Sequence, residues 1–285
     1  MTKALYVVAT PLGNLGDISA RALETLRQVD TVACEDTRHT RHLLGHYGIE
    51  ATLLAVHEHN EAAAAEKIIA LLDQGGSVAL VSDAGTPGIC DPGARVVNAV
   101  RAAGHAVVPL PGANAAAAAL SVSGMAGDRF LFCGFLPATG AARRQAIAAV
   151  KAVPAALVFY EAPHRILDTV RDLAAELEAE RQVLIARELT KLFEQVVKLP
   201  LAQAVAWLEA DDNHRRGEFV LVLSPPPPPQ GLPAEALRTL RLLLAELSLK
   251  QAVQLAAGIT GVARKTLYQQ ALDWQRAGSE DDAAV

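Results

Sequence analysis

Short apolar runs alternate with helical segments over the first 110 residues, and this alternation restricts the fold more than any other feature. The runs expected to be strands are residues 4–9, 31–34, 51–56, 77–82 and 106–110. The helices expected between them are residues 19–29, 38–47, 61–73 and 94–103. Since a helix follows each strand, successive strands run parallel and helices cover both faces of the sheet. The sequence therefore predicts an α/β domain over residues 1–115.

The pattern restarts near residue 129 with less regularity. Strands are expected at residues 130–134, 155–160, 182–186, 193–197 and 219–223, and helices at 141–152, 163–179 and 201–209. The gap between the strands at 182–186 and 193–197 is short, which favours antiparallel pairing there. We predict a second α/β domain over residues 116–224.

Five consecutive prolines, residues 225–229, then predict a stiff extended segment within a proline-rich linker, residues 225–231. A small helical domain is expected over residues 232–285, with helices at 234–247, 249–257 and 262–272 and a break containing Gly258 and Gly261. Residues 250–272 fit a helix-turn-helix, and they fit equally a helical cap that packs on the body or on a second subunit.

Composition excludes several classes of protein. Half of the chain (51%) is hydrophobic and 20% is charged, so it can bury large cores, while 4% aromatic content is low for a base-stacking surface. No apolar run approaches the ~18 residues of a membrane span, and the N-terminus lacks the layout of a signal peptide. Three widely spaced cysteines argue against a disulfide framework and a thiolate zinc site. We expect a cytoplasmic protein without a membrane segment.

The loops that follow the strands of the first domain are the candidate binding region, because ligands of open α/β sheets bind beyond the carboxyl ends of the strands. The loop at residues 10–17 is glycine-rich but contains neither G-x-G-x-x-G nor the Lys-Ser/Thr of a P-loop, which argues against dinucleotide binding and NTP hydrolysis. One glycine- or proline-rich loop is ordinarily just a turn. Five polar or glycine-rich loops at one sheet edge, residues 10–17, 34–38, 57–61, 83–93 and 111–114, predict a ligand site.

Two polar clusters in these loops have simpler explanations when each is taken alone. His57 and His59 occupy alternate positions of an extended segment and point in opposite directions, so no metal site is expected. Glu35, Asp36 and Arg38 suit a helix cap with an ion pair. Their position among the other strand-end loops favours a role in the ligand site.

Eight segments occur in the order and spacing of one known family: LYVVATPLGNLGDIS, CEDTR, HEHNE, VSDAGTPGICDPG, PLPGANA, FCGFLP, FYEAPHR and ARELTK. Over residues 5–223 the chain resembles the ribosomal small-subunit RNA methyltransferase I family of the tetrapyrrole-methylase superfamily. It departs from the family pattern at Cys90, where serine is expected, and at Asn114, where serine or threonine is usual. The resemblance implies two α/β domains with a cofactor cleft between them and a small C-terminal helical domain.

The resemblance also implies an activity. In this family a methyl group passes from S-adenosylmethionine to the ribose 2′-hydroxyl of a decoding-centre cytidine in 16S rRNA, and the enzymes are homodimers. By motif position, Gly217 and Glu218 lie at the cofactor, together with a larger set. That set is Pro11, Leu12, Asp83, Gly85, Thr86, Ile89, Gly112, Ala113, Asn114, Ala115, Tyr160, Glu161, Arg187 and Glu188.

A ribose hydroxyl is a poor nucleophile and gains from a group that accepts its proton. The candidate bases at the strand ends are Glu35, Asp36, His57 and Glu58. The net charge of −5 argues against binding nucleic acid by bulk electrostatics and requires one local basic patch. Candidates for RNA contacts are Arg38, Arg41, Arg165, Lys191, Arg264 and Lys265, with Arg143, Arg144, Arg187, Arg215 and Arg216 in support.

Three alternative functions remain open. Relatives that methylate a tetrapyrrole carbon (precorrin or uroporphyrinogen) or a protein residue usually carry a G-x-G-x-G-D first loop and a G-D-P fourth loop. The segments TPLGNLGD and GTP found here favour the RNA branch. A knotted methyltransferase would place its cofactor loops near the C-terminus. A non-catalytic RNA-binding assembly factor would bind RNA through the helical tail and would leave the strand-end loops unexplained.

Overall fold

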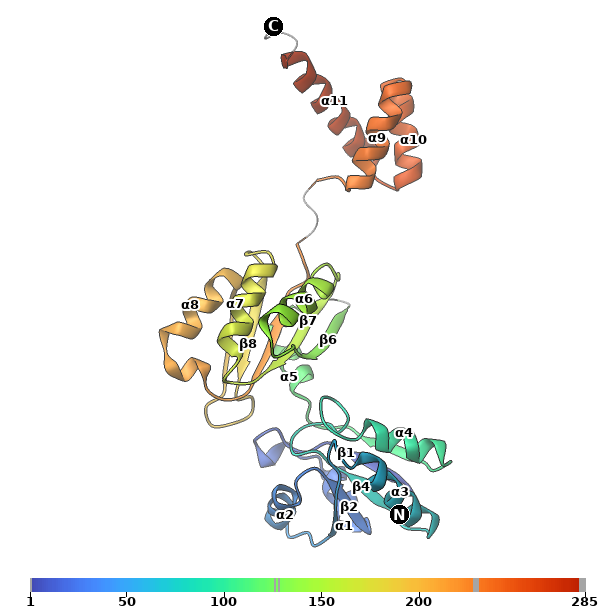
Figure 1. The fold of residues 1–285 in the computed structure, drawn as a ribbon, viewed down its shortest axis with the longest axis vertical. Coiled ribbons are helices and arrows are strands. Elements are labelled where there is room, and N and C mark those ends of the chain that lie inside the picture. Colours follow the sequence, from blue (N-terminus) through green and yellow to red (C-terminus); the bar gives the residue numbers. More distant parts are fainter. Residues whose placement is uncertain (1, 126, 128, 228–230, 282–285) are drawn as a thin grey trace. The chain divides into compact units, whose positions relative to one another are not determined.

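The computed structural model describes residues 2–125, 127, 129–227 and 231–281, which form two compact units, Met1–Pro226 and Pro227–Val285 (Figure 1). Part of the predicted proline linker, residues 228–230, lies outside the described residues. The larger unit contains two five-stranded sheets and the smaller unit contains helices. The α/β class predicted from the sequence, with a C-terminal helical domain, is confirmed.

The first sheet is parallel, with strand order β3-β2-β4-β1-β5. Its strands are β1 (Leu5–Val8), β2 (Thr31–Cys34), β3 (Thr52–Ala55), β4 (Val78–Leu80) and β5 (Val107–Leu110). Neighbouring residues of β1 face opposite sides, so Tyr6 packs on α1 (Ala20–Gln28) and α2 (Thr37–His46) while Leu5 packs on α3 (Glu61–Asp73) and α4 (Ala94–Ala102). A short 3₁₀ turn, η1 (Leu15–Asp17), lies in the loop after β1.

The second sheet is mixed, with strand order β6-β7-β10-β8-β9. Its strands are β6 (Phe130–Phe135), β7 (Ala156–Glu161), β8 (Gln182–Arg187), β9 (Gln195–Pro200) and β10 (Phe219–Leu223). β6 and β7 are parallel and the other pairs are antiparallel, including the predicted pairing of β8 with β9. The strand expected at residues 193–197 begins instead at Gln195, because a turn occupies the preceding residues and the Glu194 amide donates to the Lys191 carbonyl.

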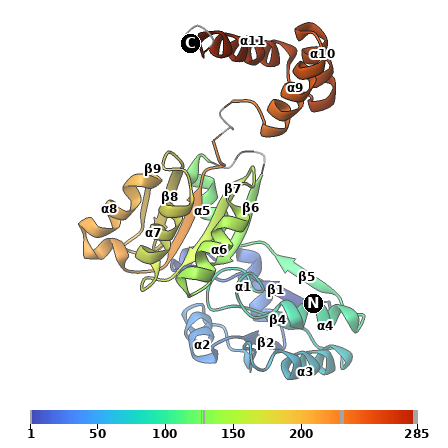
Figure 2. The same cartoon turned by 45° about the horizontal axis from the view of Figure 1, so that its top comes forward.

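Helices cover both faces of the second sheet (Figure 2). α6 (Gly140–Val150), α7 (Ile166–Glu176) and α8 (Leu201–Ala210) pack on one face around Phe159 and Leu221. α5 (Ala115–Ser123) packs on the other. The predicted helix at 163–179 is shorter in the structure because residues 163–165 form a turn and Leu177 ends α7 in an extended conformation.

The sequence analysis missed α5, which begins directly after the loop that follows β5. Its sequence, AAAAALSVS, has almost no alternation of polar and apolar residues to reveal a helical face. The Asn114 side chain caps the helix by accepting from the Ala117 amide at 3.0 Å. Gly124 ends it in the left-handed conformation, with φ of 60°.

The C-terminal unit contains α9 (Ala234–Glu246), α10 (Leu249–Thr260) and α11 (Arg264–Asp281), packed around Leu240, Val253 and Leu267. α10 continues through Gly258 and ends at Gly261, with φ of 71°, so the break expected at Gly258 is wrong. α11 begins at Arg264, two residues later than expected, and extends beyond Leu272. None of the helices in the described ranges is both long and apolar enough to cross a membrane.

Candidate functional site

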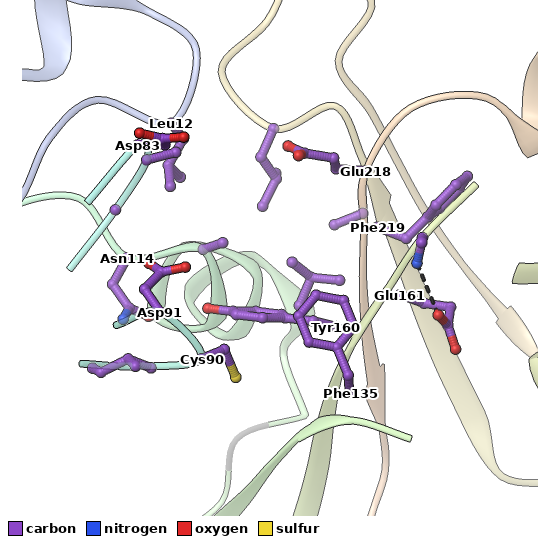
Figure 3. Close-up of a pocket in the computed structure, with 18 of the residues that line it drawn as sticks. Leu12, Asp83, Cys90, Asp91, Asn114, Phe135, Tyr160, Glu161, Glu218 and Phe219 are labelled. Carbon is purple, nitrogen blue, oxygen red and sulfur yellow. Dashed lines mark hydrogen bonds between the residues drawn. The ribbon is translucent and has the colours of Figure 1, made fainter. Parts of the chain in front are cut away.

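A cavity of about 340 Å³, the central cavity, lies where loops of the two sheets meet (Figure 3). Loops that follow β1, β4 and β5 line it from the first sheet, and residues around the ends of β7 and β8 and the start of β10 line it from the second. Several predicted cofactor residues line this cavity. They are Leu12, Asp83, Gly85, Thr86, Ile89, Asn114, Ala115, Tyr160 and Glu161.

Hydrogen bonds fix the three loops of the first sheet around the cavity. Thr10 and Gly85 exchange two backbone hydrogen bonds, of 2.9 and 3.0 Å, which join the loop after β1 to the loop after β4. The Thr86 hydroxyl donates to the Ala113 carbonyl at 2.9 Å and joins the loop after β5. The Gly93 amide donates to the buried carboxylate of Glu61 at 2.6 Å and anchors the far end of the β4 loop. The cavity wall is therefore preorganised.

Negative charge concentrates in the central cavity. Asp83, Asp91 and Glu218 contribute to its lining. Burial and the nearby Glu35 carboxylate raise the pKa of Asp91 to about 6, and burial together with Asp83 raises the pKa of Glu35. Clustered carboxylates that raise one another's pKa favour a cationic ligand, because a positive charge relieves their repulsion.

Lys191 brings one positive charge to the rim of the cavity. Its ammonium donates to the carboxylates of Glu188 and Glu218, at 2.9 Å in each case. The stem of Lys191 crosses Gly13, where a Cβ atom would collide with it, so this side chain also joins the loops after β1 and β8. Lys191, predicted to contact RNA, lies in the wall of the central cavity.

The aromatic wall of the cavity comes from the second sheet. The Tyr160 hydroxyl accepts from the Ala116 amide at 3.1 Å, and its ring packs edge-on against Phe132 and Phe135 at centroid distances of 4.9 and 5.7 Å. These contacts fix the Tyr160 ring at the N-terminus of α5 (Figure 3).

Some predicted cofactor residues support the cavity without lining it. Pro11 is buried, and Gly112 lies so close to Ala9 that a Cβ atom there would come within 2.8 Å of the Ala9 Cβ. Ala113 supplies the carbonyl that holds Thr86, and Glu188 holds Lys191. The remaining one, Arg187, donates to the Arg216 carbonyl at 3.2 Å.

Glu161 lines the cavity but its carboxylate is engaged elsewhere. It is buried and accepts from the Ala162 amide at 2.8 Å (Figure 3). It also accepts from the Thr169 hydroxyl at 2.6 Å and pairs with Arg165 at 3.2 Å. Such a fully used carboxylate shapes the turn after β7 and has little capacity left for a ligand.

The four predicted bases lie outside the lining of the central cavity. Asp36 caps α2 by accepting from the Arg38 amide, and its hydrogen bonds to the Arg38 side chain and amide lower its pKa to about 2. His57 and Glu58 are exposed at the surface, while Glu35 is half-buried and its charge reaches Asp91. Among the described residues, no three His, Cys, Asp or Glu side chains gather to hold a metal. The catalytic roles stay predictions.

The predicted RNA-contact residues fall into two groups. Arg38 and Arg41 on α2 and Arg264 and Lys265 at the start of α11 are exposed. Arg165 is held by Glu161 and donates to the Leu136 and Pro137 carbonyls. Two supporting candidates, Arg143 and Arg144, both bind Asp172, so they stabilise the packing of α6 on α7.

Several residues that line the cavity were not among the predicted site residues, including Cys90, Asp91, Phe135 and Leu189. Cys90 and Asp91 belong to the long loop that follows β4, so the position of that loop was an available signal. Phe135 is the last residue of β6 and Leu189 lies in the loop after β8, in the second domain, where irregular strand order gives no rule for which edge holds a ligand.

Comparison with known proteins identifies the family. Residues 4–205 match the model of the Tetrapyrrole (Corrin/Porphyrin) Methylases, and residues 230–275 match the RsmI C-terminal HTH domain. The protein "Ribosomal RNA small subunit methyltransferase I" of Escherichia coli O157:H7 is 52% identical over 272 residues, which are 95% of each chain. Its namesake in Pseudomonas aeruginosa is 52% identical over 274 residues, 95% of this chain and 97% of that protein. The chain belongs to the ribosomal RNA small subunit methyltransferase I family.

Solved structures of tetrapyrrole methylases share the fold of this family member. The methyltransferase CobJ covers 78% of the chain with a TM-score of 0.59 at 19% identity, and the chain covers 94% of it. A second such structure is a uroporphyrin-III C-methyltransferase from Thermus thermophilus, complexed with S-adenyl homocysteine. It covers 78% of the chain with a TM-score of 0.55 at 17% identity, and the chain covers 97% of it. At these identities the likeness establishes the fold.

The raised pKa of Asp91 predicts a pH-dependent stability cost. A carboxyl whose folded pKa is about 6, against 3.8 ordinarily, disfavours folding once it ionises, so the cost is absent below about pH 4 and complete above about pH 6. Asp91→Asn should therefore raise the free energy of unfolding at pH 8 by about 1 kcal/mol after solvent screening, and by nothing near pH 4. Urea titrations at both values measure this difference, and an equal effect at both would contradict the assignment.

Proposed function

We propose that this chain is an S-adenosylmethionine-dependent methyltransferase that acts on the ribose 2′-hydroxyl of a decoding-centre cytidine in 16S rRNA. One observation carries the proposal: 52% identity over 95% of both chains to a protein named ribosomal RNA small subunit methyltransferase I. The family resemblance supplies the acceptor atom and nucleotide.

The central cavity suits S-adenosylmethionine in size and chemistry. Its volume of about 340 Å³ is within the range of small-molecule sites. Asp83, Asp91 and Glu218 complement a positive charge, and Leu12, Ile89 and Tyr160 offer apolar and aromatic contacts. The bound cofactor supplies an activated methyl group on a cationic sulfur. The protein supplies a rigid wall that excludes water and aligns the two reactants.

The ribose hydroxyl must lose its proton as it attacks the methyl carbon, and a nearby side chain assists by accepting that proton. We expect Glu35→Gln, Asp36→Asn and His57→Gln each to lower turnover without changing cofactor affinity. The variant that removes the base itself should lower turnover by about 100-fold. Asparagine is as good a helix cap as aspartate, so Asp36→Asn preserves the start of α2. If all three variants keep wild-type turnover, the base lies elsewhere.

The alternative functions differ in what they bind. A calorimetric titration of the full chain with S-adenosylmethionine should give one site per chain. RNA affinity without cofactor affinity would instead support a non-catalytic assembly factor. Cofactor affinity without transfer to ribosomal RNA would favour a small-molecule acceptor, such as the tetrapyrrole that the name of the Thermus thermophilus structure implies for that protein.

We also infer a cytoplasmic homodimer, as the resemblance implies. Val122 at the end of α5 and Phe130 at the start of β6 are 58% and 57% exposed, which provides apolar surface for a second copy. Sedimentation equilibrium should give twice the mass of one chain, and a monomer at micromolar concentration would contradict the inference. The domain boundaries at residues 115/116 and 224/225 remain part of the proposal.

A further inference from the structure

A second hollow, the basic hollow, opens beside the central cavity on the larger unit. Its volume is about 410 Å³, and His164, Asp168, Asp212, Arg215 and Arg216 line it. Pro163, in the turn that follows β7, lines both spaces, so the two lie next to each other.

Each acidic group of the basic hollow has an arginine partner, and Arg171, the partner of Asp168, also binds Glu209. Asp212 pairs with Arg215, and Asp168 pairs with Arg171 at 3.5 Å. Arg216, in contrast, makes one long hydrogen bond to the Asn213 side chain, at 3.4 Å, and has no carboxylate partner within the described part of the chain. The hollow thus presents one guanidinium without a carboxylate partner among the described residues, and the exposed side chain of His164 also lines it as a further donor.

A second guanidinium lies behind Arg216. Arg187 at the end of β8 donates through Nη1 to the Arg216 carbonyl at 3.2 Å, and its Nε is buried without a hydrogen-bond partner in the described residues. Its charge adds to the positive potential at this position. A buried donor without a partner is uncommon in folded proteins, and an anion bound near Arg216 would also interact with the charge of this second guanidinium.

The segment that carries Arg216 is rigid. The short helix η2 (Asp212–Arg215) is capped by Asp211, which accepts from the Asn213 amide at 2.8 Å. His214 stacks on Trp207 of α8 at 3.9 Å, nearly parallel, and its Nδ1 lies 2.7 Å from the Trp207 carbonyl. Little conformational freedom is lost when a ligand binds to such a segment, which favours affinity.

The chemistry of the central cavity explains why a neighbouring cation is needed. Its carboxylates suit a cationic cofactor but repel the phosphates on either side of an acceptor ribose. The net charge of −5 adds to this repulsion. An acceptor strand can therefore enter only where fixed positive charge lies next to the cavity.

We propose that the basic hollow binds a backbone phosphate of the acceptor RNA strand, with Arg216 as its principal ligand. A guanidinium suits this role because its planar donors match two phosphate oxygens at once. His164, which also lines the hollow, is a further donor, and the Arg187 side chain holds the Arg216 backbone through its hydrogen bond to the carbonyl. The inference rests on the proposed function, and it specifies where the RNA strand lies relative to the cofactor.

The test compares Arg216→Gln with Arg101→Gln, which removes the same charge from an exposed position on α4. The probe is the small ribosomal subunit from a strain that lacks the methylation, and binding is measured at several salt concentrations. We expect Arg216→Gln to bind about tenfold more weakly than wild type and to lower the slope of log affinity against log salt by about 0.7 to 1. Arg101→Gln should match wild type, and Arg216→Lys should recover the slope but only part of the affinity.

Cofactor affinity, measured by calorimetry, should be unchanged in both glutamine variants. If Arg216→Gln behaves as Arg101→Gln does while wild type methylates the subunit, the phosphate site is wrong and the proposed function stands. If wild type neither binds nor methylates the subunit, the proposed function and the phosphate site both fail.

Discussion

The Ala115→Trp variant is expected to bind S-adenosylmethionine at least about 100-fold more weakly than the wild-type protein, because a large ring takes the place of the ligand. Ala115 is the first residue of α5 and lines the central cavity. An indole at this position fills much of a space of about 340 Å³. Methyl transfer to the small subunit should then fall below detection, and calorimetry with the cofactor measures the loss directly.

The matched control for this substitution is Ala117→Trp. Ala117 lies on the same helix, is exposed and takes no part in the cavity lining. The Ala117→Trp variant should bind the cofactor as wild type does. The circular dichroism spectra of Ala115→Trp and Ala117→Trp should both match that of wild type. Equal cofactor affinity in the two variants would show that the ligand lies outside the central cavity.

The second large effect is expected on stability, from a substitution of Arg181. This side chain is fully buried at the start of β8, where it donates to the Ser224 carbonyl at 2.9 and 2.6 Å and to the Lys151 carbonyl at 3.2 Å. Burial lowers its pKa, although Glu178 at 3.6 Å acts in the opposite direction. Arg181→Ala leaves both carbonyls without this donor and opens a cavity. We expect the free energy of unfolding to fall by about 3–5 kcal/mol and the melting temperature to fall on the order of 10 °C.

Arg171→Ala provides the comparison, since it also removes a guanidinium, one that pairs with two carboxylates at the surface. Arg171 is half-exposed and binds Asp168 and Glu209 at the surface of α7 and α8. Exposed ion pairs contribute little to stability, so Arg171→Ala should lower the free energy of unfolding by less than about 1 kcal/mol. Differential scanning calorimetry measures both variants, and similar losses would contradict a special role for the buried arginine.

The sequence predicted the elements that carry a strong local pattern. The strand at Thr31–Cys34, the helix at Glu61–Asp73 and the strand at Phe219–Leu223 have the predicted bounds, because an apolar run or a helical repeat ends at each of them in a polar or glycine-rich segment. α5 was missed because nine nearly uniform small residues give no periodic signal, and its position is set by packing on β7 and β10.

Contacts with distant parts of the chain explain why some predicted site residues have a different role in the structure. Glu161 and Arg165 follow a strand, as ligand-binding residues do, yet the Thr169 hydroxyl and the Leu136 carbonyl engage them in internal contacts. Nothing in the local sequence reveals those partners. Burial raises the pKa of Asp91, and the charge of Glu35, more than fifty residues away in the chain, raises it further, so its importance emerges only when the loops are brought together.

The most direct test of the account transfers a labelled methyl group from S-adenosylmethionine to small ribosomal subunits that lack the modification. The RNA is then digested to nucleosides, and the labelled product is identified. The account predicts label in 2′-O-methylcytidine with wild type and none with Ala115→Trp. Label on a base carbon or nitrogen, or no transfer by a protein that binds the cofactor, would contradict it.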